Sequence, residues 1–179
     1  MDRYAAFLRG MNIGGRRIKN EELGAAVEGL GFEGVETFRA SGNVIFESEE
    51  SAPGRIASRL EAGLAEALGY EVPVFLRTGA EVRAIAAHEP FSAAQTAGSA
   101  GKLQVALLRA KPKAAAQKQV RALATEQDRL SIRGRELYWL PNGGMSDSEL
   151  DLNAIGAALG LTTMRTKGTI EQIATKHFA

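Results

Sequence analysis

The stretch YAAFLRGMNIGGRR, residues 4–17, joins a short apolar run to a segment rich in glycine and arginine. Residues 4–8 are apolar on both alternating faces, which is typical of a central strand covered on two sides. Three glycines and three arginines follow within residues 9–17. Glycine allows backbone conformations that other residues avoid, and arginine supplies fixed positive charge. We therefore expect a central strand that ends in a loop suited to an anionic ligand.

Apolar periodicity in the rest of the chain gives the same order of elements twice. Residues 1–91 and residues 102–179 each read as strand, helix, strand, strand, helix, strand and helix. The segment 92–101 is small and polar, and we take it as the linker. The predicted fold is therefore α+β, with two tandem ferredoxin-like (βαββαβ) subdomains that have antiparallel sheets.

Short sequence matches favour a tandem duplication. Residues 6–9 (AFLR) are similar to residues 106–109 (ALLR), and the pair Arg-Thr ends the fourth strand of each half at residues 77–78 and 165–166. Matches of this length arise by chance, so the shared order of elements carries more weight.

The expected strand order brings two distant segments together. In a βαββαβ unit the first and third strands lie in the middle of the sheet. Pro73 suits an edge strand because proline cannot donate to the ladder, and the charged residues Glu36 and Arg39 suit the other edge. The end of the first strand and the turn between the second and third strands then share one end of the sheet. We expect residues 9–17 to meet the Ser41–Asn43 hairpin there.

Composition narrows the class of protein. The chain has 179 residues, of which 45% are hydrophobic and 24% charged, enough for a substantial core. It has no cysteine, which excludes disulfides, thiolate nucleophiles and cysteine-bound metals. No segment is long or apolar enough to cross a bilayer or to act as a secretory signal, so we expect a cytoplasmic protein with no membrane partner.

The net charge of +1 hides an asymmetry between the halves. Residues 1–100 carry 10 Lys and Arg against 14 Asp and Glu, whereas residues 101–179 carry 12 against 7. The charges of −4 and +5 are compatible with an ordinary solvated surface, with packing between the halves, or with a basic face for a polyanion.

The candidate ligand-binding residues come from the basic loop and the hairpin. They are Arg9, Gly10, Asn12, Gly14, Gly15, Arg16, Arg17, Ser41 and Asn43. Backbone N–H groups freed by glycine and nearby guanidinium groups bind phosphate, so a phosphorylated small molecule or a nucleotide is the expected partner. The structural alternative is that the glycines serve turn geometry, the arginines are solvated, and Ser41 and Asn43 bond their own backbone.

The spacing Gly10-x4-Gly15 is similar to a phosphate-binding P-loop but departs from it at the decisive positions. Arg16 and Arg17 stand where that loop has its lysine and its magnesium-binding hydroxyl. A nucleotide hydrolase is therefore not expected.

We find no sequence signature of catalysis, cofactor or metal. His88 and His177 are expected to be structural, and the predicted topology places no base beside Ser41. The acids at positions 147, 149 and 151 alternate as in a calcium loop, but Leu152 replaces the required glycine. They instead suit the first turns of a predicted helix 148–159. Whether the protein is an enzyme is left open, because no acid–base pair can be named.

Two other functions remain open. The basic residues Lys111, Lys113, Lys118 and Arg121 indicate a surface for RNA or other nucleic acid. Within this hypothesis, one of the aromatic residues at 138–139 could stack on a base, although a core position is the commoner role of a lone tryptophan. The last alternative is a scaffold or oligomerisation module with no ligand.

Four segments together resemble one bacterial family, the domain of unknown function 1697 (DUF1697). They are Leu8–Gly15 (LRGMNIGG), Ser41–Asn43 (SGN), Val72–Thr78 (VPVFLRT) and Glu89–Phe91 (EPF). The resemblance implies an α+β fold of two related subdomains and no established activity.

The second half departs from the family pattern at two places. Glu149 reverses the charge expected in a Ser-Lys-Leu segment, and Arg165–Thr169 (RTKGT) replaces an Arg-Asn-Trp-Asn-Thr segment. The resemblance therefore carries no functional site over to these positions.

Overall fold

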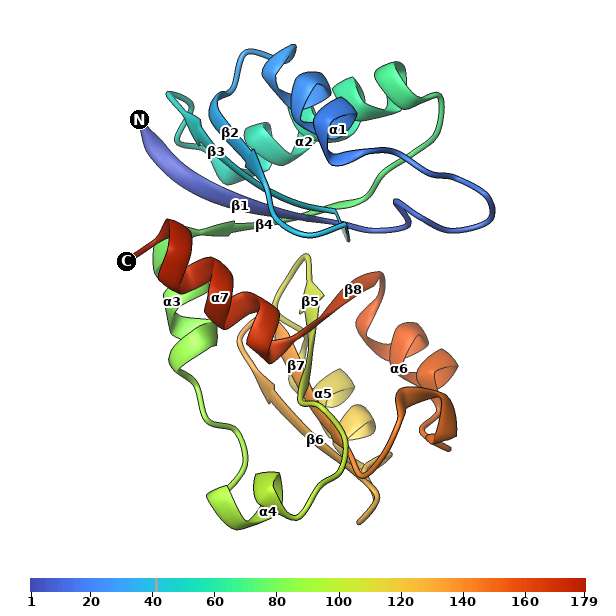
Figure 1. Cartoon of the computed structure of the whole chain (residues 1–179). Coiled ribbons are helices and arrows are strands. Elements are labelled where there is room, and N and C mark those ends of the chain that lie inside the picture. Colours follow the sequence, from blue (N-terminus) through green and yellow to red (C-terminus); the bar gives the residue numbers. More distant parts are fainter. Residues whose placement is uncertain (41) are drawn as a thin grey trace. The chain divides into compact units, whose positions relative to one another are not determined.

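The computed structural model describes residues 1–40 and 42–179, which form an α+β protein with two four-stranded sheets (Figure 1). The elements are β1 (Asp2–Leu8), α1 (Asn20–Glu28), β2 (Glu33–Thr37), β3 (Asn43–Ser48), α2 (Pro53–Leu68), β4 (Val74–Thr78), α3 (Gly79–Ala87), α4 (Ala93–Ala97), β5 (Gln104–Leu108), α5 (Ala114–Arg121), β6 (Asp128–Arg133), β7 (Glu136–Pro141), the 3-10 helix η1 (Met145–Asp147), α6 (Leu152–Leu159), β8 (Thr162–Thr166) and α7 (Lys167–His177).

Contacts divide the chain into two compact units. The first unit is Met1–Arg83 with Ile173–Ala179, and the second unit is Ala84–Gln172. Residues 173–179 thus group with the first unit, whereas the sequence placed them in the second subdomain. The reason is that the end of α7 packs on the first unit, where the His177 ring lies 6.0 Å from the Phe38 ring.

The sheet of the first unit has the order β2-β3-β1-β4, with every neighbouring pair antiparallel. The predicted ferredoxin-like order, with the first and third strands inside, is confirmed. β1 is central because residues 4–8 are buried on both faces of the strand. β4 occupies an edge, as the sequence predicted from Pro73, although the strand begins directly after that proline.

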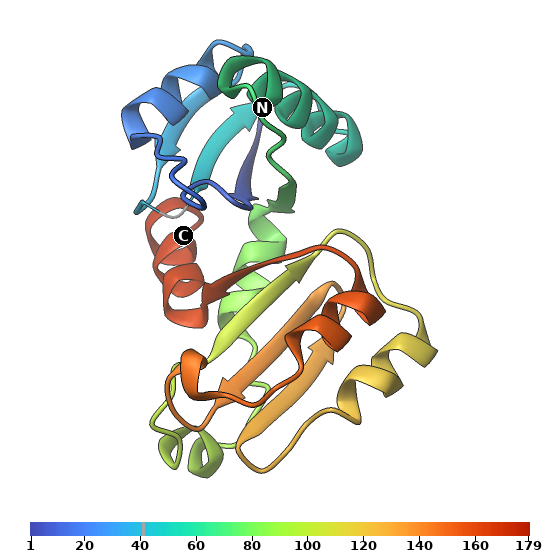
Figure 2. The ribbon, with the colours of Figure 1, turned by 90° about the vertical axis from the view of Figure 1, so that its right-hand side faces the viewer.

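Helices α1 and α2 cover one face of this sheet (Figure 2). Leu23 and Val27 of α1 and Leu60 and Leu64 of α2 are buried there against alternate residues of β1, such as Ala6. The spacings of three or four residues put these side chains on one stripe of each helix. The apolar stripes of α1 and α2 therefore pack on one face of the sheet and build the core on that side.

The second unit repeats this topology, with the sheet order β6-β7-β5-β8 and its own core beneath α5 and α6. The register repeats as well. Ala5 lies opposite Arg77 in the first sheet, and Val105 lies opposite Arg165 in the second. The Arg-Thr pairs noted in the sequence therefore occupy equivalent positions, which supports the duplication.

Two segments differ from their predicted structure. The expected linker 92–101 contains the short helix α4, because the Ser92 hydroxyl accepts from Gln95 N at 3.1 Å and caps it. The predicted helix 148–159 begins only at Leu152. Asp151 provides the cap through its bond from Ala154 N, at 2.9 Å.

In the described residues, no helix is both long and apolar enough to cross a membrane.

The two fourth strands end in equivalent helix caps, which gives a test of the repeat. The Thr78 hydroxyl accepts from Glu81 N at 3.2 Å, and the Thr166 hydroxyl accepts from Thr169 N at 3.2 Å. We expect Thr78→Ala and Thr166→Ala each to lower the free energy of unfolding by about 1 kcal/mol, measured by urea denaturation. Thr78→Ser keeps the hydroxyl and is the control; equal stability of Thr78→Ala and wild type would contradict the capping role.

Candidate functional site

The loop after β1 depends on its glycines. Gly10, Gly14 and Gly15 have φ angles of 74°, 63° and 83°, a region that other residues rarely adopt. The backbone N–H of Arg16 donates to Ile13 O at 3.1 Å and closes a turn around the last two of them. The glycines therefore set the path of the loop, as the structural alternative required, and they leave residues 12–17 exposed.

This loop meets the hairpin, as the sequence predicted. Leu8 N donates to Gly42 O at 2.8 Å, and the Asn12 side-chain amide donates to Ala40 O at 2.6 Å. Ser41, the remaining hairpin candidate, lies outside the described residues. The start of the loop and the hairpin residues before and after Ser41 are thus brought to one end of the sheet.

Asn43 faces inward. Its side-chain amide donates to Phe38 O at 2.8 Å, and Phe38 N donates back to Asn43 O at 2.9 Å. Asn43 is 1% exposed. It therefore stabilises the turn, and its predicted role as a ligand contact is not favoured by this geometry.

The arginines at the far end of the loop line a cleft on the helical side of the first unit. The Arg16 guanidinium lies over the Tyr70 ring, 4.2 Å from its centroid. A cleft of about 480 Å³ lies beside this pair, and Arg17, Leu68 and Glu22 contribute to its walls. We call it the Arg16 cleft. Two parts of the loop therefore make different contacts: Asn12 bonds the hairpin, and Arg16 lines the cleft.

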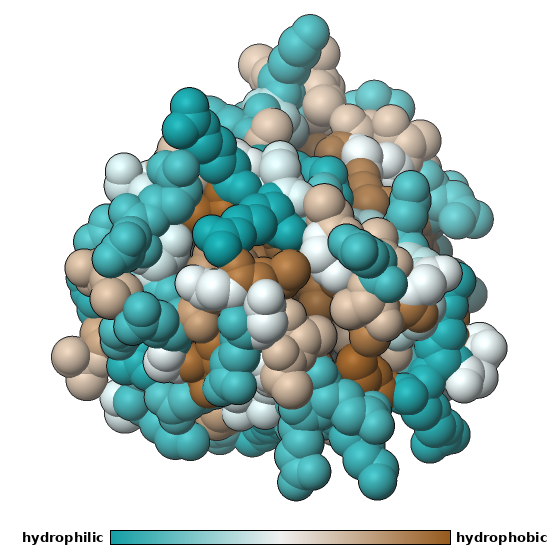
Figure 3. Space-filling model, turned by 90° about the horizontal axis from the view of Figure 1, so that it is seen from above, coloured by the Kyte–Doolittle hydropathy of each residue, from teal (hydrophilic) through white to brown (hydrophobic). Residues whose placement is uncertain are grey.

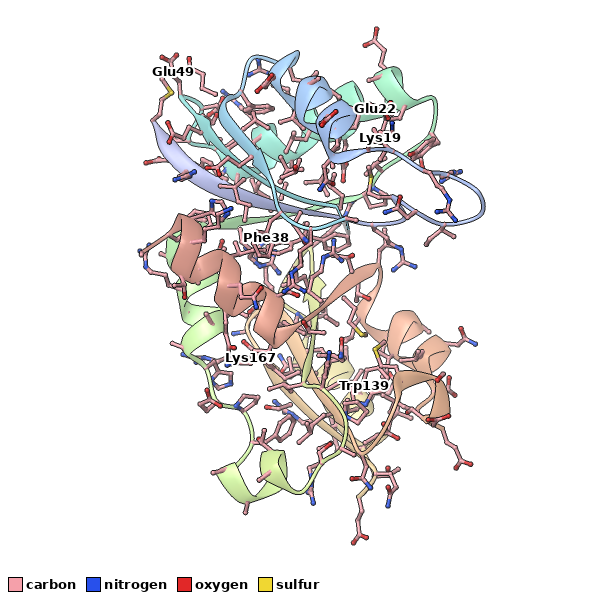
Figure 4. All side chains as sticks on the ribbon, in the orientation of Figure 1. Lys19, Glu22, Phe38, Glu49, Trp139 and Lys167 are labelled. Carbon is pink, nitrogen blue, oxygen red and sulfur yellow. The ribbon has the colours of Figure 1, made fainter. Side chains whose placement is uncertain are left out.

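The charges around the Arg16 cleft are mostly positive. Within the described chain, Arg16 and Arg17 form no ion pair with a carboxylate. Glu22 accepts from the backbone N–H of Lys19 at 3.2 Å, and both residues lie at the start of α1 (Figure 4). Arg9 is exposed, and its backbone N–H donates to Pro73 O at 3.0 Å.

Figure 3 shows the helical side of the first unit, where hydrophilic side chains surround small patches of apolar surface. Ala26 and Leu68 supply apolar wall to the Arg16 cleft next to its arginines. Sequence reasoning missed the Tyr70 side of the cleft. Residues 16 and 70 are far apart in the chain, and only the packing of α1 on α2 brings their surroundings together.

The second unit provides an internal comparison for the loop. Leu8 and Asn20 bound a connection of eleven residues in the first unit, whereas Leu108 and Ala114 bound the equivalent connection with five. The fold therefore needs only a short link at this point. The six extra residues belong to the glycine-rich, basic segment, and long connections in compact domains are often functional.

The aromatic pair of the second unit offers no surface for base stacking. Tyr138 and Trp139 are both 1% exposed. The Trp139 indole N–H donates to the Asp128 carboxylate at 2.8 Å, and the same oxygen accepts from the Ser148 hydroxyl at 2.7 Å. The hypothesis that one of these aromatic residues stacks on a base is therefore wrong. Asp128 instead fixes Ser148 and the loop that carries it.

The two histidines lie in structural surroundings. His88 contacts the Tyr138 ring, and burial together with Arg133 and Lys167 lowers its pKa below the usual value. Burial also lowers the pKa of His177, although Glu36, 3.5 Å from His177 Nδ1, acts in the opposite direction. No group of three or more histidine or acidic side chains among the described residues is arranged to hold a metal ion.

Lys167, at one of the positions that depart from the family pattern, is buried in the second unit (Figure 4). Its ammonium donates to Ala86 O at 2.9 Å, to Glu89 at 3.3 Å and to Glu171 at 2.5 Å. Burial also lowers the pKa of nearby Arg165 to about 10. These cations are occupied by their own protein, so they act structurally.

The fold and the loop define a class of protein: two ferredoxin-like halves, the first of which carries a long glycine-rich loop. The model of the family described as protein of unknown function (DUF1697) matches residues 1–138. The chain therefore belongs to this family, as its motifs indicated. A search of curated proteins gives no match.

A solved structure has the same fold, that of the conserved bacterial protein SP0830 from Streptococcus pneumoniae. The TM-score is 0.76 over 98% of this chain and 97% of that chain, with 22% sequence identity. At this identity the similarity extends to the fold alone.

The contact between loop and hairpin can be tested at Gly42. A Cβ there would lie 2.8 Å from Met11 Cγ and 3.3 Å from Leu8 O, and φ is 73°. We expect Gly42→Ala to lower the free energy of unfolding by about 1–3 kcal/mol in urea denaturation. Gly54→Ala is the matched control, because a Cβ at Gly54 meets no atom within 4 Å and its φ is not positive. Equal stability of the two variants would contradict the close approach.

Proposed function

We propose that the protein binds a small anionic ligand, a phosphorylated metabolite or a nucleotide, at the Arg16 cleft and the adjoining loop. The observation that carries the proposal is the loop itself. It is six residues longer than its counterpart in the second unit, and it holds two exposed arginines at the mouth of a cleft. The fold requires neither the length nor the charge, so both point to a ligand.

The chemistry of the cleft suits a ligand with a charged part and a flat apolar part. Stacking on Tyr70 holds the Arg16 guanidinium in place, which reduces the ordering that binding would require. Arg17 adds a second guanidinium, and such groups bind phosphate with paired hydrogen bonds. Ala26 and Leu68 offer apolar surface for a ring. The cleft volume of about 480 Å³ lies in the range of small-molecule sites.

The neighbouring charges favour an anion. Arg16 and Arg17 line the cleft against the single carboxylate of Glu22. That carboxylate already accepts a hydrogen bond from the start of α1, which offsets part of its repulsion of a phosphate.

Binding is favoured over catalysis. Glu22 is the one titratable group besides the arginines and Tyr70 in the described wall of the cleft, and it has no partner arranged as a nucleophile. We therefore propose a binding role without a reaction.

The test is a thermal-shift screen of nucleotides and sugar phosphates, followed by calorimetry on any ligand that stabilises the protein. We expect Arg16→Ala and Arg17→Ala each to weaken binding about tenfold or more, because a hydrogen bond to a charged group contributes about 1.5–3 kcal/mol. Tyr70→Ala should weaken binding by leaving Arg16 unsupported, whereas Tyr70→Phe keeps the ring and should bind as wild type does.

Arg55→Ala is the matched control, since Arg55 lies on α2 of the same unit and its side chain is 81% exposed. It should leave binding unchanged. The proposal fails if no compound in the screen raises the melting temperature, or if the Arg16 and Arg17 variants bind as tightly as the Arg55 variant.

A further inference from the structure

Exposed positive charge gathers at one end of the second sheet. β5 ends and the β6–β7 hairpin turns at this end, since Leu107 lies opposite Glu136. The exposed cations here are Arg109, Lys111, Lys113 and Arg133, and the hairpin adds the half-buried Arg135 and Glu136. The opposite end has mixed charge, because Lys102 and Arg129 lie there with Glu126, Asp147, Glu149 and Asp151.

Helix α5 extends the positive charge away from this end. Lys113 precedes the helix, Lys118 and Arg121 lie on it, and all three are exposed. Together with Lys111 we call them the α5 basic surface. Residues 109–121 contain no acidic residue, so no carboxylate of the segment itself can neutralise these charges.

The fold does not demand this charge. Helix α1 occupies the equivalent place in the first unit, after the central strand, and it carries Glu21, Glu22 and Glu28 with no basic residue. Helix α5 carries Lys118 and Arg121 with no acidic residue. The two copies keep one topology with opposite charges, so the charge of α5 is a separate property of the second unit.

In the described part of the chain, no carboxylate pairs with the cations of the α5 basic surface. Lys111, Lys113 and Lys118 form no ion pair within the described residues. Arg121 donates to the neutral side chain of Gln117 at 3.3 Å. Four like charges in one segment repel one another, and an anionic polymer would relieve that repulsion.

The spacing of the charges suits a nucleic-acid strand. Lys113 and Arg121 are eight residues apart, a helical rise of about 12 Å. A duplex carries one phosphate per strand about every 3.4 Å of its axis, so this length faces about three to four phosphates. Tyr138 and Trp139 are buried, so neither of these aromatic residues offers a face on which bases could stack.

We propose that the α5 basic surface binds the phosphate backbone of nucleic acid without reading its sequence. Phosphate contacts position a protein on a strand but carry no sequence information. This role is independent of the ligand proposed for the Arg16 cleft, because it uses other residues in the other unit.

Fluorescence anisotropy with short labelled DNA and RNA duplexes of mixed sequence tests the proposal over salt from about 50 to 200 mM. We expect wild-type affinity to fall steeply with salt. The triple variant Lys111→Gln/Lys113→Gln/Lys118→Gln should bind about tenfold or more weakly at low salt, and its log–log salt slope should be shallower by about 2 to 3. Two duplexes of unrelated sequence should bind alike.

The control triple Arg55→Gln/Lys102→Gln/Lys176→Gln removes the same charge from exposed positions elsewhere. It should keep near wild-type affinity. The proposal is overturned if wild type does not bind either duplex, if the two triples weaken binding equally, or if one sequence is preferred more than about tenfold. Circular dichroism of each variant confirms that it is folded.

Discussion

Burial of one strand on both faces is the constraint on which the rest of the first unit depends. β1 has five consecutive buried residues, so it needs a neighbouring strand on each side and cover above and below. β3 and β4 take the two sides. Once β1 is central, its last residue must lie beside the turn that leads into β3, as the bond from Leu8 to Gly42 shows. The position of the basic loop therefore follows from the core.

The second unit shows which features this constraint does not determine. It has the same strand order and the same register of its fourth strand, yet its first connection is six residues shorter and its first helix has the opposite charge. Two copies of one topology thus separate what folding requires from what is optional. Folding does not require the loop length or the surface charge. Both proposed binding surfaces are built from these two features.

Sequence alone predicted the parts that depend on local pattern. Alternation, helical periodicity and the missing N–H of Pro73 gave the strand order and the edges, and from these the meeting of the loop with the hairpin. Contacts between side chains from different elements could not be predicted from the sequence. Tyr70 beneath Arg16, the inward turn of Asn43 and the packing of His177 on the first unit each depend on how helices and strands pack. No periodicity encodes such contacts, because each requires the three-dimensional positions of two distant segments.

The buried ammonium of Lys167 has a consequence for chemical probing. Its three donors are all engaged, and its side chain is 5% exposed. An acylating reagent that modifies the surface amines within minutes has no access to this one until the second unit opens. The rate at which Lys167 becomes labelled would then report how often the second unit opens. A single lysine would thus measure the transient unfolding of its own unit.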